Sequence, residues 1–147
     1  MVGSMIACEE CGASGRLGSC TELFGALLAL DHERRQPWGR FHGLNVACFQ
    51  LQHPSATTVS AVGGQWQVVN TFLAGGLTAI QDLQTRWVRS NRRGARPWPA
   101  ADSVPARSAP PTVTIEDVSV DGTFPASGYE ERMHAWAKSV AAERVTA

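Results

Sequence analysis

The sequence predicts a mainly α fold, a small helical bundle that begins with a cysteine-containing loop and has a short extended or β segment before its last helix. Apolar residues recur at the spacing of an α-helix in several stretches of the chain. Capping boxes, which place a glutamate three residues after a serine, begin two of these stretches. At 147 residues, the chain has the length of one domain with a real core. We therefore expect residues 1–147 to form a single helical domain.

The charge balance disfavours nucleic acid or an anionic membrane as the main partner. The chain has 13 lysines and arginines and 13 aspartates and glutamates, so its formal net charge is +0 at pH 7. A neutral protein has no net electrostatic attraction for a polyanion. No apolar run reaches the roughly 20 residues that span a bilayer, and residues 1–7 lack the basic and apolar regions of a secretory signal. We expect a cytoplasmic protein.

The first helix is predicted over residues 20–34. Ser19 and Glu22 form a capping box at its start, and Pro37 stops the run. The apolar stripe of this helix consists of Leu23, Phe24, Leu27, Leu28 and Leu30.

The second helix is predicted over residues 41–52 and ends at Pro54. The connection from the first helix, residues 36–40, is short, so the two helices are expected to be antiparallel neighbours. The buried face of the second helix is predicted to contain Phe41, Leu44, Cys48 and Leu51.

A third helical stretch spans residues 60–89, although two glycine pairs weaken it. Each interior glycine costs about 1 kcal/mol relative to alanine, and the pairs stand at residues 63–64 and 75–76. Either the second pair breaks the stretch into two helices, or the glycines allow close helix approach. The apolar stripe consists of Val62, Trp66, Val69, Phe72, Leu73, Leu77, Ile80, Leu83 and Trp87.

The remaining third of the chain begins with a crossing rich in proline and arginine, residues 91–112, which holds five of the eight prolines. Residues 112–120 then alternate partly between apolar and polar side chains, as in a short strand or an extended arm. The last helix is predicted over residues 127–145, with Ser127 and Glu130 as a capping box. Its buried stripe is Tyr129, Met133, Trp136 and Val140.

Cys8, Cys11 and Gly12 form the most informative motif. A Cys-x-x-Cys pair followed by glycine makes a tight turn that directs both thiolates to one point, and Cys20 supplies a third thiolate. Loop residues follow the motif, whereas a thioredoxin-type redox pair requires a helix there. In the cytoplasm, where thiols are kept reduced, such cysteines are expected to be metal ligands or free thiols and not disulfides. Residues 1–19 are therefore predicted to form a zinc knuckle that binds Zn²⁺.

Helix geometry ranks the candidates for a fourth ligand. An intact helix separates His42 from His53 by roughly 16 Å, so the two cannot bind one ion. Antiparallel pairing brings the start of the first helix, and with it Cys20, close to His53. The predicted metal ligands are Cys8, Cys11, Cys20 and His53, with His42 as the alternative fourth ligand. The other role open to His53 is to cap helix-end carbonyls, and Cys48 is interpreted as a core residue.

A looser cluster is expected at the other end of the same helix pair. His32 and His42, with Asp31 or Glu33, offer imidazole and oxygen groups that suit a catalytic metal with open coordination positions. The spacing does not require such a site. His32 and His42 are accordingly the candidate catalytic residues.

Several short motifs together resemble a family of uncharacterised bacterial proteins, classed as a domain of unknown function. The motifs read Cys-x-x-Cys-Gly, Cys-x-Glu-Leu-Phe, Leu-Leu-Ala-Leu-Asp, His-x-Leu-x-Val and Leu-Gln-His-Pro. They are carried by Cys8, Cys11 and Gly12, by Cys20 and residues 22–24, by residues 27–31, by His42, Leu44 and Val46, and by residues 51–54. The tail, with residues 115–118 and 136–140, is similar too. The resemblance implies a small metal-binding protein and no assigned reaction.

Two functions remain open from the sequence. The first is a zinc-binding protein whose metal is structural and which acts as an adaptor or a regulatory protein, as a monomer or a homodimer, on an unknown protein or small-molecule partner. Trp38 and Trp98 are the exposed tryptophans expected on its binding surface. The alternative is a small zinc-dependent enzyme with a metal-bound water and a histidine acid or base. A nucleic-acid-binding zinc knuckle is disfavoured because aromatic and basic residues are not interleaved around the cysteines.

Overall fold

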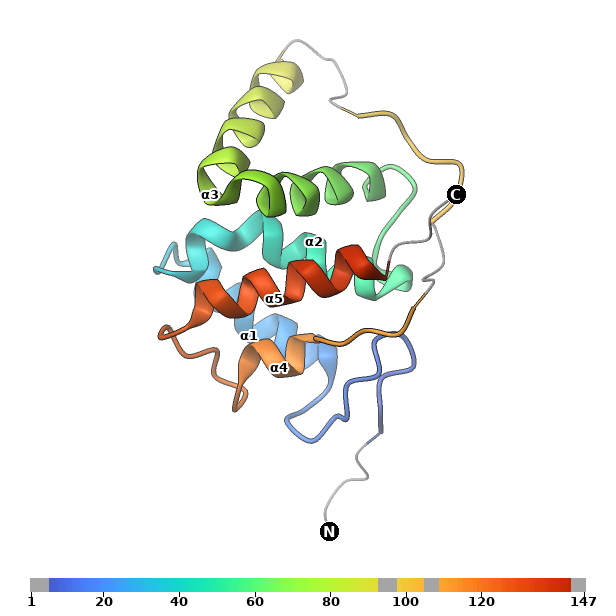
Figure 1. Ribbon diagram of the computed structural model, residues 1–147, viewed down its shortest axis with the longest axis vertical. Helices are drawn as coiled ribbons and strands as arrows, with labels where there is room; N and C mark the ends of the chain where they lie inside the picture. Colours follow the sequence, from blue (N-terminus) through green and yellow to red (C-terminus); the bar gives the residue numbers. More distant parts are fainter. Residues whose placement is uncertain (1–5, 93–97, 105–108, 144–147) are drawn as a thin grey trace.

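The computed structural model describes residues 6–92, 98–104 and 109–143, which fold into helices joined by loops (Figure 1). No strand forms within these ranges, so the prediction of a mainly α bundle is confirmed. The helical elements are α1 (Cys20–His32), the 3-10 turn η1 (Trp38–Phe41), α2 (His42–Gln52), the 3-10 turn η2 (Pro54–Ala56), α3 (Val62–Arg92), α4 (Ile115–Ser119) and α5 (Tyr129–Ala142). None of the helices described is long and apolar enough to cross a membrane.

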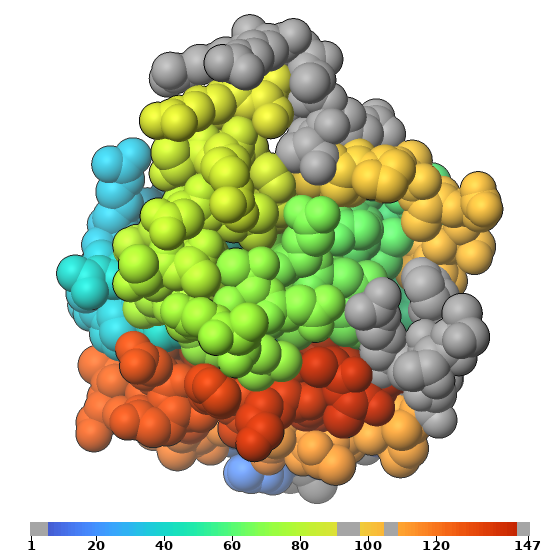
Figure 2. All heavy atoms as spheres, turned by 45° about the horizontal axis from the view of Figure 1, so that its top comes forward, coloured from blue at the N-terminus to red at the C-terminus, as the bar shows by residue number. Residues whose placement is uncertain are grey.

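Helix α5 lies at the centre of the bundle. It packs against α2, α3 and α4, and Figure 1 shows it crossing the molecule with α3 on one side and α4 on the other. Figure 2 shows α5 running alongside α3. Its predicted stripe is buried, as expected for a helix with neighbours on several sides. The largest fully buried side chains of the core include Trp136, Tyr129, Phe41, Phe124, Leu27 and Leu44.

The first two helices form the predicted antiparallel pair. The capping box of α1 is present: the Ser19 hydroxyl accepts from the Glu22 backbone N–H at 3.1 Å, and the Glu22 carboxylate accepts from the Ser19 N–H at 3.0 Å. Helix α1 ends at His32, two residues before its predicted end, and α2 ends at Gln52 as predicted. The start of α1 therefore lies beside the end of α2.

Helix α3 bends at Gly76, where the backbone adopts φ 73° and ψ −161°. This region of backbone space is essentially restricted to glycine. The bend divides α3 into a first arm, residues 62–75, and a second arm, residues 77–92, which rises away from the bundle in Figure 1. The predicted break at the second glycine pair is confirmed.

The expected strand or extended arm over residues 112–120 is wrong in its second half. Residues 115–119 form the short helix α4, while Thr114 before it is extended. Thr114 and Asp117 make a capping box, with the Asp117 carboxylate accepting from the Thr114 N–H at 2.9 Å. The capping box offers the backbone a helical start in place of strand pairing.

The predicted capping box of the last helix is also wrong. Helix α5 begins at Tyr129, and its N-cap is Gly128, whose φ is 76° and which has no capping side chain. The left-handed turn at Gly128 moves Ser127 out of the capping position, and the Ser127 carbonyl accepts from the Arg132 guanidinium at 2.7 Å instead. Residues 144–145 of the predicted helix lie outside the described residues.

The two tryptophans expected to be exposed are both partly buried. The Trp38 indole donates to the Phe124 carbonyl at 2.9 Å, and the Trp98 indole donates to the Ser60 carbonyl at 2.8 Å. Residues 98–104 pass back beside α3 (Figure 2). The centre of the predicted crossing, residues 93–97 and 105–108, lies outside the described residues.

Candidate metal centre

Cys8, Cys11, Cys20 and His53 lie together at the start of α1 and the end of α2. Their donor atoms, three sulfurs and one imidazole nitrogen, all lie within 4.8 Å of one another, and the Sγ atoms of Cys11 and Cys20 are 3.5 Å apart. Zinc–sulfur bonds of about 2.3 Å in a tetrahedron place two sulfurs about 3.7 Å apart. We call these four residues the Cys₃His cluster, and its spacing fits a single metal ion.

The Cys-x-x-Cys turn is held by its own backbone. The Cys8 N–H donates to the Ala13 carbonyl and the Gly12 N–H donates to the Cys8 carbonyl, each at 2.8 Å. The Cys11 N–H points at the Cys8 sulfur at 3.5 Å. The turn is thus preorganised for ligation.

Cys20 is the first residue of α1, directly after its N-cap Ser19. The N-terminus of a helix carries a partial positive charge. Cys20 and Cys8 are both half-buried, whereas Cys11 is enclosed. All three cysteines are free, and none forms a disulfide.

His53 has the tautomer of a metal ligand. It caps α2, and its Nδ1 lies 2.7 Å from the Phe49 carbonyl, an acceptor, so Nδ1 carries the proton. Its ring also stacks on Phe49 at a centroid distance of 4.2 Å. Nε2 is buried and has no hydrogen-bond partner among the described residues. Metal-bound histidines show this division, with one nitrogen on the metal and the other donating to a carbonyl.

The close approach of the four side chains shifts the pKa values of Cys11, Cys20 and His53. The Cys20 thiol and, to a lesser extent, His53 lower the pKa of Cys11, although burial opposes them. The pKa of Cys20 is raised, first by its contact with Cys11 and then by burial. Burial alone lowers the pKa of His53, but the proximity of the Cys11 thiolate and the Phe49 carbonyl raise it to about 9. Thiolate charge collected in a half-buried site is typical of a cation-binding position.

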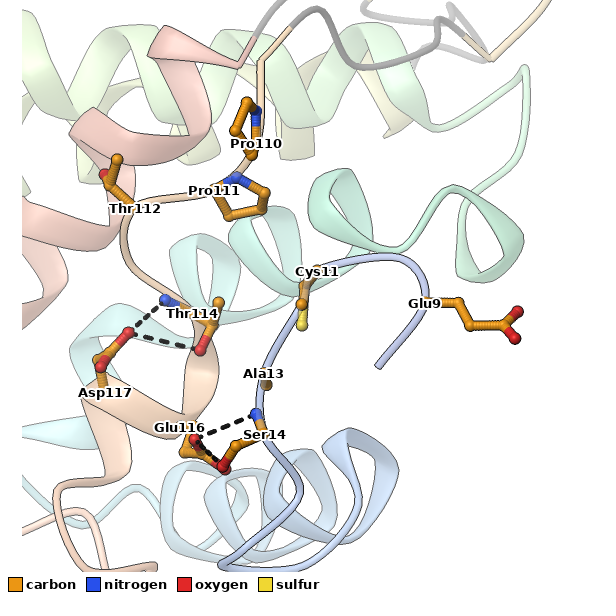
Figure 3. A pocket seen from close by; sticks show the side chains of 11 residues that line it. Glu9, Cys11, Ala13, Ser14, Pro110, Pro111, Thr112, Thr114, Glu116 and Asp117 are labelled. Atoms are coloured by element: carbon orange, nitrogen blue, oxygen red, sulfur yellow. Dashed lines mark hydrogen bonds between the residues drawn. The ribbon is translucent and has the colours of Figure 1, made fainter. Parts of the chain in front are cut away.

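The loop that carries the cysteines is also tied to α4. The Glu116 carboxylate accepts from the Ser14 hydroxyl at 2.8 Å and from the Ser14 N–H at 3.3 Å (Figure 3). It also accepts from the Gly15 N–H at 3.1 Å. A cavity of about 530 Å³ lies beside this contact. The carboxylates of Glu116 and Asp117 in its wall are already bonded within the protein. These two carboxylates of the cavity wall therefore serve structural contacts.

A further contact joins the loop to the end of α2. The Glu10 carboxylate accepts from the Ser55 N–H at 3.0 Å and from the Ser55 hydroxyl. Ser55 lies in η2, two residues after His53. The loop is thus attached on two sides, to η2 and to α4, with the Cys₃His cluster between them.

The other predicted site residues lie elsewhere. His42 is at the opposite end of α2, where its Nδ1 lies 3.0 Å from the Asp31 carboxylate. His32 is exposed, and Glu33 pairs with Arg35 at 3.7 Å. Cys48 is fully buried in the core, where burial raises the pKa of its thiol. The structure thus brings His53, and not His42, to the cysteines.

Sequence reasoning missed a buried polar chain through Asp31, Asn45 and Tyr129. The Asn45 side-chain amide donates to Asp31 at 3.0 Å and accepts from the Tyr129 hydroxyl at 2.6 Å. The signal was present, because Asp31 follows Leu23 and Leu27 at intervals of four on the inward face of α1.

The fold and the cluster define a small helical protein with a candidate metal site made from three cysteines and one histidine. A family model described as a family of unknown function (DUF5946) matches residues 6–144, so the chain belongs to that family. The predicted resemblance to an uncharacterised family is confirmed. No curated protein and no solved structure matches the chain.

Proposed function

We propose that the Cys₃His cluster binds one Zn²⁺ as a closed structural site, and that the chain is a binding or regulatory protein rather than a zinc enzyme. The observation that carries the proposal is the buried Nε2 of His53, which has no hydrogen-bond partner among the described residues. Burying such a group costs about 1–3 kcal/mol. A metal ion bound to this nitrogen removes the cost.

A structural role is supported by what the cluster joins. The three cysteines come from the N-terminal loop and the first residue of α1, whereas His53 comes from the end of α2. Four protein ligands complete the tetrahedron of zinc and leave no position for a reactive water. The ion would hold the loop on the helix pair and, through Glu116, on α4.

The preference for a structural site also follows from the ligands. Three thiolates donate strongly to zinc, so a water on such an ion is a poorer acid than on a histidine-rich site. Glu10, a nearby carboxylate, accepts a hydrogen bond from Ser55. A cytoplasmic adaptor or regulator, as a single domain over residues 1–147, is the function that we propose.

Metal content of single-residue variants tests this proposal. Zinc-loaded wild-type protein is expected to hold one zinc per chain, and Cys20→Ser is expected to lose it, because serine is a poor zinc ligand. Cys48→Ala is the matched control, since Cys48 is a cysteine of the core and lies outside the cluster. It should retain zinc at the wild-type ratio.

Stability measured with and without a chelator separates the two functions. A structural zinc adds to folding free energy, so chelation should lower the melting temperature of wild type and leave Cys20→Ser unchanged. If chelation leaves the wild-type melting temperature unchanged, or if Cys20→Ser keeps a full zinc complement, the structural role is wrong.

A further inference from the structure

A second cavity, of about 290 Å³, lies at the far end of α2 from the Cys₃His cluster. It fills the angle that the Gly76 bend opens between the two arms of α3. Val46 and Ala47 of α2 form one wall, and Gln65 and Val68 of the first arm form another. Trp87 of the second arm and Trp98 close it.

The two tryptophans give this cavity aromatic walls. The Trp87 and Trp98 rings are 4.6 Å apart and inclined by 56°. Trp98 is fixed in place by its hydrogen bond to Ser60 and by contact with Gly64, where an added Cβ would come within 2.6 Å of the indole. The opposite walls consist of the small or aliphatic side chains of Val46, Ala47 and Val68, together with Gln65. Flat aromatic surfaces facing small residues favour a planar ligand.

One end of the cavity is polar and its groups have free hydrogen-bonding capacity. His42 lines the cavity, and its Nδ1 is fixed by the Asp31 carboxylate at 3.0 Å. Because Asp31 is an acceptor, Nδ1 is the nitrogen that donates, and in the neutral ring Nε2 is the acceptor. The Gln84 side-chain amide lies against Gly43, the residue next to His42, and forms no hydrogen bond with the described residues.

The carboxylate behind His42 is itself unusual. The Asp31 side chain is fully buried, and its Oδ1 has no hydrogen-bond partner within the ranges described. Native proteins rarely leave such a group in the core, and those that do often use it at a functional site. Its Oδ2 contacts both Asn45 and His42, and the second contact restrains the imidazole ring that lines the cavity.

We propose that this cavity binds a small planar aromatic molecule with a hydroxyl or N–H group, which donates a hydrogen bond to His42 Nε2. An apolar cavity of about 150 Å³ holds one benzene ring. The cavity at 290 Å³ therefore has room for a one- or two-ring compound such as a phenol or an indole. The site is separate from the Cys₃His cluster and does not depend on the metal.

Binding of phenol and toluene to the zinc-loaded protein, followed by amide chemical shifts, tests the proposal. The two probes match in size, but only phenol carries a hydroxyl. Saturable shifts are expected at residues lining the cavity, with phenol binding several-fold more tightly than toluene. No saturable shifts there, or equal affinities for the two probes, would overturn the proposal.

Two variants locate the site. His42→Asn keeps an amide donor for Asp31 but has no counterpart of Nε2, so it should weaken phenol roughly 2- to 10-fold and leave toluene unchanged. His32→Asn, the same change at an exposed neighbour, should have no effect. Val46→Phe fills the cavity and should abolish binding of both probes. Unchanged phenol affinity in both His42→Asn and Val46→Phe would contradict the assignment.

Discussion

The bend in α3 gives the sharpest test of the fold. Gly76 has a backbone conformation that a residue with a Cβ adopts only at a cost of order 1–3 kcal/mol. No atom lies within 4 Å of an added Cβ, so the cost arises from the backbone alone. Alanine also lowers the conformational entropy of the unfolded chain, which stabilises the folded protein by about 0.4–1 kcal/mol. Gly76→Ala should therefore lower the free energy of unfolding by about 1–2 kcal/mol.

Gly25 provides the matched control. It is an exposed glycine in the middle of α1, and an added Cβ there also has no atom within 4 Å. Because Gly25 is helical, Gly25→Ala should raise the free energy of unfolding by about 0.5–1 kcal/mol. The same chemical change is thus expected to have opposite signs at the two positions.

Urea unfolding of the two zinc-loaded variants, followed by far-ultraviolet circular dichroism, measures this difference. The two free energies of unfolding should differ by about 1.5–3 kcal/mol, which exceeds the usual error of such an extrapolation. If Gly76→Ala stabilises the protein as Gly25→Ala does, α3 is a continuous helix. The cavity between its arms would then not exist in solution.

Three further predictions concern buried or linking groups. After chelation of the zinc, a thiol reagent should modify three cysteines. Cys48, whose pKa is raised by burial, should react only on unfolding. Four reactive thiols in the folded apoprotein would contradict the placement of Cys48 in the core. Glu116→Ala should lower the free energy of unfolding by about 1–2 kcal/mol, because the hydrogen bonds from Ser14 and Gly15 are lost. Glu130→Ala, the same change at an exposed position, is the control and should lower it by less than about 0.5 kcal/mol. Tyr129→Phe should cost about 1–3 kcal/mol because the Asn45 carbonyl loses its donor. Burial raises the pKa of Tyr129, so its contribution is full below about pH 10 and declines above it, and wild type should lose stability faster than Tyr129→Phe in that range.

Much of the helical fold was predictable because its signals are local. The Ser19–Glu22 capping box set the start of α1, and helix-breaking prolines bounded α1 and α2. The pairing of those helices then placed Cys20 beside His53, since a short connection allows few other arrangements. The Cys₃His cluster could be assembled on this basis from spacing alone.

The errors arose where local patterns compete. Residues 112–120 alternate between apolar and polar side chains, as a strand does. The Thr114–Asp117 capping box starts a helix there, but it has aspartate where the usual pattern has glutamate. At the start of α5, Ser127 and Glu130 match a capping box, yet the positive φ of Gly128 prevents it from forming. Sequence patterns do not distinguish a glycine with positive φ from a helical one.

Long-range contacts were beyond sequence reasoning. Glu116 binds Ser14 across 102 residues of chain, and no local pattern links the two. The cavity beside His42 depends on the bend at Gly76 and on the return of Trp98 to Gly64. Such sites follow from how helices pack, which depends on the whole chain at once.

X-ray absorption at the zinc edge tests the central claim most directly. In the zinc-loaded protein we predict three sulfur neighbours at about 2.3 Å and one nitrogen neighbour at about 2.0 Å. His53→Ala should replace the nitrogen of imidazole with oxygen from water, or lose the metal, while Cys48→Ala leaves the spectrum unchanged. A wild-type spectrum with fewer than three sulfurs, or without an imidazole contribution, would contradict the closed Cys₃His site.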